Sequence, residues 1–241
     1  MTLFRNAFAW FIALLVVLVI GFWRTYFSQL WQCTVDLAHH AHGLAMLVWV
    51  LLLISQSWLI RTGDLTRHRA FGRVSFVVAP AVFVTACWVN LHFLRRVMVE
   101  DGLGPGDPVP GPLLSIYWFG YFLAIAFAVL FVLAIVHRKK FERHARYMVS
   151  TAFVFVIPGL GRALDNYVES LTGWIPSFFQ LQALVFLACL WLLFRDWRSG
   201  RELTPFAVNA SLWGANLVLW LLLPSIGAFE RFTRWSAALV T

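Results

Sequence analysis

Seven long apolar runs constrain the fold of this chain more than any other feature. A helix needs about 20 apolar residues to cross a bilayer, and only 12% of the residues are charged, against about a quarter in a soluble domain. We therefore predict an all-α integral membrane bundle, one domain over residues 1–241, with about seven transmembrane helices. The predicted spans are 7–23, 43–60, 74–94, 113–136, 147–164, 177–194 and 207–229.

The basic residues predict the orientation of these spans. Thirteen of the 19 Lys and Arg residues fall at the N-terminus or after the second, fourth and sixth spans. By the positive-inside rule that face is cytoplasmic, which predicts a cytoplasmic N-terminus and an external C-terminus in a bacterial inner membrane. The net charge of +8 then reflects topology and a lipid bilayer partner, with no nucleic acid. The thirteen are Arg5, Arg61, Arg67, Arg69, Arg73, Arg138, Lys139, Lys140, Arg143, Arg146, Arg195, Arg198 and Arg201.

Proline and glycine mark two irregular regions. The segment from Glu100 to Pro112 is rich in both and predicts a non-helical external loop. Pro158 and Gly161 interrupt the fifth span, where we expect a kinked or partly unwound helix whose freed backbone groups are met by neighbours or water.

A weak internal repeat relates two helical hairpins. The string Arg67-His68-Arg69-Ala-Phe-Gly-Arg73 precedes a span with Pro80, and Arg143-His144-Ala-Arg146-Tyr-Met precedes a span with Pro158. Spans two and three thus resemble spans four and five, as in a duplicated hairpin.

Four histidines form the most unusual pattern in the chain. His39, His40 and His42 lie in the string Asp36-Leu-Ala-His-His-Ala-His-Gly43 at the outer mouth of the second span, and His92 lies near the outer end of the third. Neutral imidazoles ligate haem iron and transition metals. We therefore predict haem b on these four residues, or a transition metal on His39, His42 and His92, at one depth. The alternative is that all four are solvated in the headgroup region.

Polar residues near this cluster have predicted supporting roles. Asp36 and Asp165 would accept a ring N–H from a histidine, and Arg162 lies three residues before Asp165, where the two would form an ion pair. The alternative for that pair is to fix the depth of the helix end.

On the opposite face, His68 and His144 begin equivalent helices among basic residues. They predict a contact with quinone or a second haem, or with anionic lipid. Gln56, inside an apolar run, predicts an interhelical partner.

The chain resembles two groups of membrane proteins. The HHxHG string at His39 to Gly43, the HRxxGR string at His68 to Arg73, and Tyr26-Phe27 are similar to a group of bacterial polytopic membrane proteins whose function is uncharacterised. The likeness covers residues 24–165. A looser likeness is to cytochrome b561-type haem proteins, which implies haem held between facing helices. Here the fourth span lacks an outer histidine, so the haem ligands would have to be His42 and His92, on adjacent helices.

Three functions remain open from the sequence. The first is a redox subunit that binds haem b or a metal and exchanges electrons with quinone; the second is a non-catalytic accessory subunit of a larger membrane complex. The third is a small-solute transporter that uses the broken fifth span and Gln56. No nucleophile–base pair, P-loop or dinucleotide motif indicates an enzyme. The cysteines, Cys33, Cys87 and Cys189, are too widely spaced for a redox motif.

Overall fold

The computed structural model describes residues 6–32, 35–100, 102–103, 107–173 and 177–238, and Cys33 lies outside them. All regular structure in these ranges is helical. The principal helices are α2 (Ala7–Phe22), α3 (Leu37–Thr62), α5 (Ser75–Glu100), α6 (Gly111–Val136), α8 (Phe153–Ala163), α10 (Phe178–Arg198) and α11 (Thr204–Leu222). The shorter ones are η1 (Phe27–Gln32), α4 (Leu65–Gly72), α7 (Phe141–Ser150), η2 (Leu164–Val168), α9 (Glu169–Thr172), η3 (Leu223–Ser225) and α12 (Gly227–Ala238).

Six helical segments in the described part of the chain are long and apolar enough to cross a membrane. The chain is therefore a helical membrane bundle, as its composition predicts. The predicted count of seven is not confirmed, because α2 has only 16 residues, roughly 24 Å of helix at 1.5 Å per residue, against a hydrocarbon core of about 30 Å. Even so, α2 lies within the bundle, along α3 and α8.

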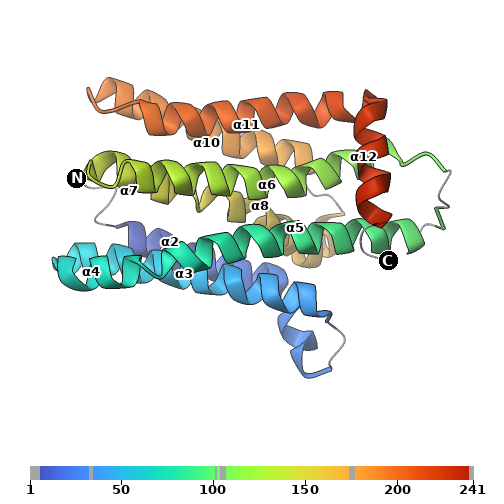
Figure 1. Cartoon of the computed structure of the whole chain (residues 1–241), viewed down its shortest axis with the longest axis horizontal. Coiled ribbons are helices and arrows are strands. Elements are labelled where there is room, and N and C mark those ends of the chain that lie inside the picture. Colours follow the sequence, from blue (N-terminus) through green and yellow to red (C-terminus); the bar gives the residue numbers. More distant parts are fainter. Residues whose placement is uncertain (1–5, 33–34, 101, 104–106, 174–176, 239–241) are drawn as a thin grey trace.

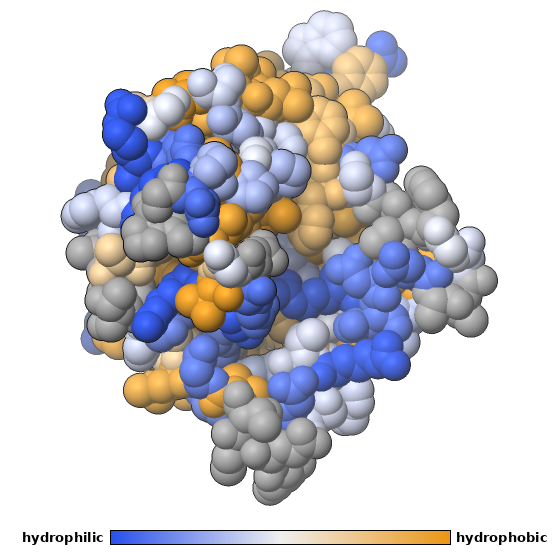
Figure 2. Space-filling model, turned by 90° about the vertical axis from the view of Figure 1, so that its right-hand side faces the viewer, coloured by the Kyte–Doolittle hydropathy of each residue, from blue (hydrophilic) through white to orange (hydrophobic). Residues whose placement is uncertain are grey.

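The helices run back and forth along one axis, so the bundle has two ends (Figure 1). We call them the α4 end, where α2 begins and α4 and α7 lie, and the α12 end. The basic connections after α3, α6 and α10 all lie at the α4 end. Figure 2 shows the α12 end, where hydrophilic residues gather across the centre and hydrophobic residues lie along the upper margin. Polar ends on an apolar bundle fit a membrane-spanning protein.

The predicted fifth span is broken, but not where we expected. The helix runs through Pro158 and Gly161 as α8. Two irregular turns flank it: residues 151–152 separate α7 from α8, and the π-helical turn η2 follows Ala163. Pro158 cannot donate a backbone hydrogen bond. At the first of these turns the Ala152 N–H donates to the Val149 carbonyl at 3.0 Å, three residues back rather than four.

The last predicted span, 207–229, is too long by about one turn. α11 ends at Leu222, the short η3 turn contains Pro224, and the separate helix α12 begins at Gly227. α12 crosses the end of the bundle (Figure 1). Its Ser236 hydroxyl lies 2.7 Å from the Tyr117 hydroxyl of α6, and Glu230 accepts the Val109 N–H at 3.1 Å. α12 is thus held at the end of the bundle by polar contacts.

Two glycines allow α2 to pack closely against α8. A Cβ added to Gly21 would collide with the Gly159 carbonyl oxygen, and one added to Gly159 would meet the Leu18 side chain. Small residues let helix backbones approach in this way. The close approach positions the C-terminal half of α2 beside the start of α3.

The two halves of the predicted repeat have similar local structure. In each, a long helix (α3 or α6) leads through a turn into a short helix with a histidine, His68 on α4 or His144 on α7. A longer helix then begins, with a proline five residues after its first residue: Pro80 in α5 and Pro158 in α8.

Candidate functional site

A cavity of about 490 Å³ opens beside the start of α3, and we call it the Asp36 cavity. Its walls come from α2, from the residues around η1, and from α3, with one arginine each from α5 and α8. Apolar walls with a few polar groups are typical of sites for small molecules. The lining includes Asp36, His39, His42 and Arg162, four of the residues singled out from the sequence.

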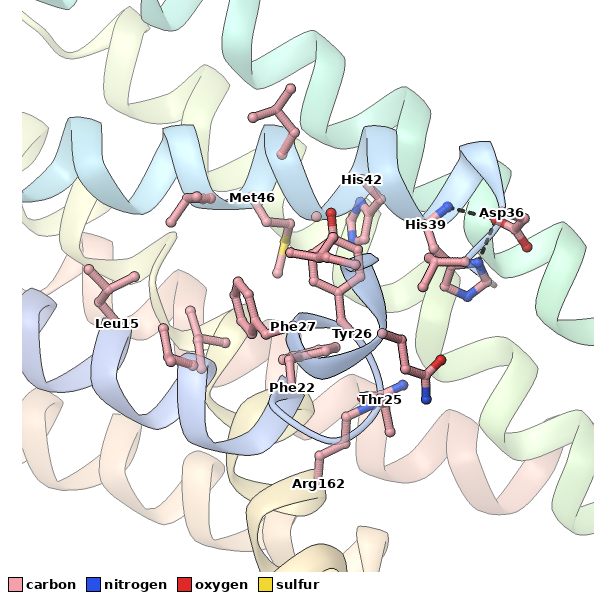
Figure 3. Close-up of a pocket in the computed structure, with 18 of the residues that line it drawn as sticks. Leu15, Phe22, Thr25, Tyr26, Phe27, Asp36, His39, His42, Met46 and Arg162 are labelled. Atoms are coloured by element: carbon pink, nitrogen blue, oxygen red, sulfur yellow. Dashed lines mark hydrogen bonds and ion pairs between the residues drawn. The ribbon is translucent and has the colours of Figure 1, made fainter. Parts of the chain in front are cut away.

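The HHxHG string builds one wall of this cavity. The Tyr26 hydroxyl lies 3.3 Å from His40 Nδ1, and the Tyr26 ring lies against Gly43, where an added Cβ would come within 3.0 Å of the ring. Tyr26, Phe27 and Phe22 face His42 and Met46 of α3 across the cavity (Figure 3). His40 and Gly43 therefore hold the segment after α2 against α3.

Asp36 and His39 form a hydrogen-bonded pair at the polar end of the cavity. Asp36 caps α3: its Oδ1 accepts the His39 N–H at 2.9 Å and lies 2.7 Å from His39 Nδ1. Partial burial raises the pKa of the Asp36 carboxyl, but the hydrogen bonds from His39 outweigh it and bring the pKa below its ordinary value of 3.8. An ionised carboxylate only accepts. His39 therefore carries a proton on Nδ1, and Nε2 is the nitrogen that can take up or release one.

His42 is held by α5 rather than by another histidine. The Thr85 hydroxyl donates to the Ala81 carbonyl at 2.7 Å, so its oxygen accepts from His42 Nδ1 at 3.2 Å. This assignment leaves His42 Nε2 as an unprotonated acceptor.

His92 lies further along α5 than the sequence suggested. Thr85, the partner of His42, precedes His92 by seven residues, which is about 10 Å along a helix. The predicted common depth of His42 and His92 is therefore wrong by about two turns. His92 Nε2 accepts from the Trp88 indole N–H at 2.8 Å and is not part of the cavity lining.

The four histidines thus have four different partners: Asp36, Tyr26, Thr85 and Trp88. Among the described residues, no group of three or more His, Cys, Asp or Glu side chains could hold a metal ion. The predicted set of His39, His42 and His92 is not brought together.

Arg162 and Asp165 do not form the ion pair that their spacing predicted. Within the described chain, no ion pair joins them. The Arg162 guanidinium instead lies 4.6 Å from the centre of the Phe22 ring and donates to the Pro158 carbonyl at 3.5 Å. Nor do the described hydrogen bonds join Asp165 to a histidine. Asp36 alone has the predicted supporting role.

Two further features have no counterpart among the predicted site residues. Arg96 of α5 lines the polar end of the Asp36 cavity, which a pattern centred on histidine could not reveal. At the α4 end, Arg146 of α7 is buried with Asp196 of α10, and Arg146 Nε donates to Asp196 Oδ2 at 2.8 Å. In the sequence, Asp196 lies close to Arg195 and Arg198, a pattern typical of a solvated helix end. Only the tertiary structure shows that Asp196 is buried.

The fold defines a helical integral membrane protein with a largely apolar cavity at its α12 end. Comparison with protein-family models, curated proteins and solved structures finds no match to this chain. The resemblances to the bacterial group and to b561-type proteins therefore gain no support from it.

Proposed function

We propose that this membrane protein binds a lipid-soluble molecule with a small polar head, of the quinone class, in the Asp36 cavity. The observation that carries the proposal is the Asp36–His39 pair at one end of an otherwise largely apolar cavity. A quinone has the matching shape: an apolar tail, and two carbonyl oxygens that accept protons when it is reduced. No other pair of described titratable groups combines this contact with such a setting.

The residues around the head have distinct roles in this proposal. His39 Nε2 exchanges a proton with a quinol hydroxyl, and Asp36 stabilises the imidazolium that forms. Arg96 and Arg162 place cationic side chains on the lining, which favours the electron-rich carbonyl oxygens. Arg96 is 56% exposed and also pairs with Glu100, so Arg162 has the larger role. Leu15, Phe22 and Met46 contact the tail.

Haem is a poorer fit to the same residues. Axial ligation from both faces requires histidines on opposite sides of the ring, whereas His39 and His42 project from one helix, three residues apart. Neither haem nor a metal ion therefore has a role in the proposal. In the proposal, this chain is the quinone-binding subunit of an electron-transfer system whose redox partner is a separate protein.

Photolabelling with an azido-quinone tests the proposal. We expect saturable labelling of peptides from α2 and α3 in the purified protein, with competition by a short-chain ubiquinone. His39→Ala and the cavity-filling Met46→Trp should each weaken binding about tenfold, which is roughly 1.4 kcal/mol.

His92→Ala is the matched control, because His92 is at the same end of the bundle but outside the lining. Its charge acts weakly on Asp36, but its removal leaves both hydrogen bonds between Asp36 and His39 in place. Equal losses in the His39 and His92 variants, or labelling that does not saturate, would overturn the proposal and favour an accessory subunit. The absorption spectrum and metal content of the same sample test the haem and metal predictions, since haem gives a Soret band.

A further inference from the structure

A second and larger cavity, of about 690 Å³, lies at the α4 end. We call it the basic cavity, because Arg69, Arg73, Arg138 and Lys139 are on its lining. His68 and His144, the two histidines of the repeat, line it as well. Among the described residues that line it, none is acidic. This cavity therefore has a strong positive potential.

The acidic residues near this cavity already form ion pairs with other cations. Asp64 pairs with Arg67 at 3.4 Å, Glu202 pairs with Arg143, and Asp196 pairs with Arg146 and Arg195. Across the described ranges, no ion pair involves any of the four cations on the lining. Their charge is thus available to a bound anion.

Two buried donors or acceptors in the cavity also lack a partner. Gln56 is only 9% exposed and lines the cavity, and neither its Nε2 nor the buried His68 Nδ1 has a hydrogen-bond partner in the described structure. A buried polar group without a partner costs about 1–3 kcal/mol. A ligand that accepts a hydrogen bond from the Gln56 amide would remove this cost.

His144 is held by its own helix hairpin. Its Nδ1 donates to the Ala134 carbonyl at 2.8 Å, so Nε2 of the neutral ring is an acceptor and His144 is not among the donors to an anion. Deeper in, the walls are apolar and include Phe11, Leu52 and Met148. The cavity thus combines a cationic rim, a buried amide donor and an apolar interior.

We propose that the basic cavity binds the phosphate group of an anionic ligand, held by Arg69, Arg73, Arg138 and Lys139 with the Gln56 amide as an inner donor. Phosphate offers several acceptor oxygens and at least one full negative charge, which suits several arginine forks. Two sources have this chemistry: the headgroup of an acidic phospholipid, whose chains would occupy the apolar walls, and a soluble phosphate. The site is separate from the Asp36 cavity and does not depend on the proposed quinone.

Binding to the purified full-length protein tests the site. The probes are inorganic phosphate, short-chain phosphatidylglycerol and short-chain phosphatidylcholine, measured by calorimetry at constant ionic strength. We expect phosphatidylglycerol to bind at least tenfold more tightly than phosphatidylcholine. Tight binding of inorganic phosphate as well would identify a soluble phosphate as a ligand, whereas its absence would identify the lipid headgroup.

The variants separate a built site from general surface charge. Arg69→Gln with Arg73→Gln should weaken binding at least tenfold, and Gln56→Leu should weaken it severalfold. Arg67→Gln is the matched control, because Arg67 is on the same helix, 73% exposed and already paired with Asp64. Equal losses in the control, unchanged binding in Gln56→Leu, or no preference over phosphatidylcholine would each overturn the site. Elution as a single folded species in size-exclusion chromatography confirms that each variant is intact.

Discussion

The two cavities have much in common but differ in their polar groups. Both are lined by α2 and α3, contain histidines and include arginines. The Asp36 cavity has a carboxylate that pairs with a histidine, whereas the described lining of the basic cavity has no acid. In our two proposals this one carboxylate sets the chemistry: beside it, a histidine would exchange a proton with a neutral head, and without it, the cations would hold an anion.

The cavities also differ in what holds their walls. The basic cavity depends on α7, which the buried Arg146–Asp196 ion pair connects to α10. The Asp36 cavity depends on the end of α2, which packs on α8 through Gly21 and Gly159. A defect in either support should therefore damage one cavity and spare the other, and this separation can be tested.

Breaking the buried ion pair should have the largest effect. Asp196 is fully buried and Arg146 is 1% exposed, so Asp196→Ala removes the buried carboxylate that neutralises this cation, and Glu142, which also pairs with Arg146, is 57% exposed. We expect a loss of about 3–5 kcal/mol in the free energy of unfolding. The measurement is SDS-induced unfolding in mixed micelles.

Two further variants of this pair serve as controls. Glu142→Gln removes the carboxylate that is 57% exposed on the same arginine and should cost less than about 1 kcal/mol. Arg146→Met with Asp196→Leu removes both charges and should recover most of the stability. Phosphate binding should fall in Asp196→Ala while quinone labelling persists. A double variant as unstable as the single one would show that the pair is not the cause.

Adding one methyl group to Gly21 should have the next largest effect. The new Cβ would collide with the Gly159 backbone oxygen, which cannot rotate away, so α2 must shift from α8. Overpacking of this kind costs about 1–3 kcal/mol. Quinone labelling should weaken in Gly21→Ala, while binding at the basic cavity persists.

Gly161→Ala is the control for this variant, since its added Cβ would make only ordinary contacts, the nearest at 3.7 Å. We expect its stability and labelling to be unchanged. If both alanine variants behaved alike, helix propensity rather than the close approach would explain the result.

Much of the fold was predictable, because apolar runs and basic connections report directly on the membrane. The ends of the spans were less predictable. The last span ends near Pro224, where the η3 turn leads into α12, and α12 contacts Tyr117 at the end of the bundle. The fifth span is interrupted at residues 151–152 and after Ala163, on either side of Pro158 and Gly161 rather than at them. Such effects come from neighbouring helices, which one sequence does not display.

The candidate site was predictable in part. Asp36, His39 and His42, which the sequence predicts as one site, line one cavity, because they share one helix mouth; their role in a site stays a prediction. It also paired His68 with His144 through the repeat, and both line the basic cavity. The predicted register of α3 against α5 was wrong by about two turns, since nothing in the sequence of either helix fixes their relative depth. His92 was therefore placed with His42, although Thr85 occupies that position.

The smallest expected effects concern pH, and they distinguish the cavities in one experiment. Burial, the nearby His144 and Arg69 lower the pKa of His68 from its ordinary value of 6.5, and a hydrogen bond with the Gln56 backbone raises it only in part. The unfolded chain then binds a proton at His68 before the folded chain does. Stability should therefore decline as the pH falls below about 6.5, until the folded pKa is reached.

Asp36 acts in a lower window. Its folded pKa lies below the ordinary value of 3.8, so the unfolded carboxylate takes up a proton first. Its contribution is fully present above that value and is lost as the pH falls through the folded pKa. Because Asp36 is 46% exposed, solvent screening makes this second step the smaller one.

Thermal unfolding between pH 8 and pH 3 should accordingly show a decline near pH 6 and another at acidic pH. His68→Gln should reduce the decline near pH 6 and leave the acidic one. Asp36→Asn should leave the first and reduce the acidic decline, to which Glu202 and Glu230 also contribute because their arginine partners lower the pKa of their carboxyls. Saturating phosphatidylglycerol should shrink the His68 decline, because an anion beside the imidazole favours its protonated form and raises its pKa. If phosphatidylglycerol instead changed the pH dependence of unfolding equally in His68→Gln, that result would show that the bound anion lies among the exposed arginines and does not reach His68.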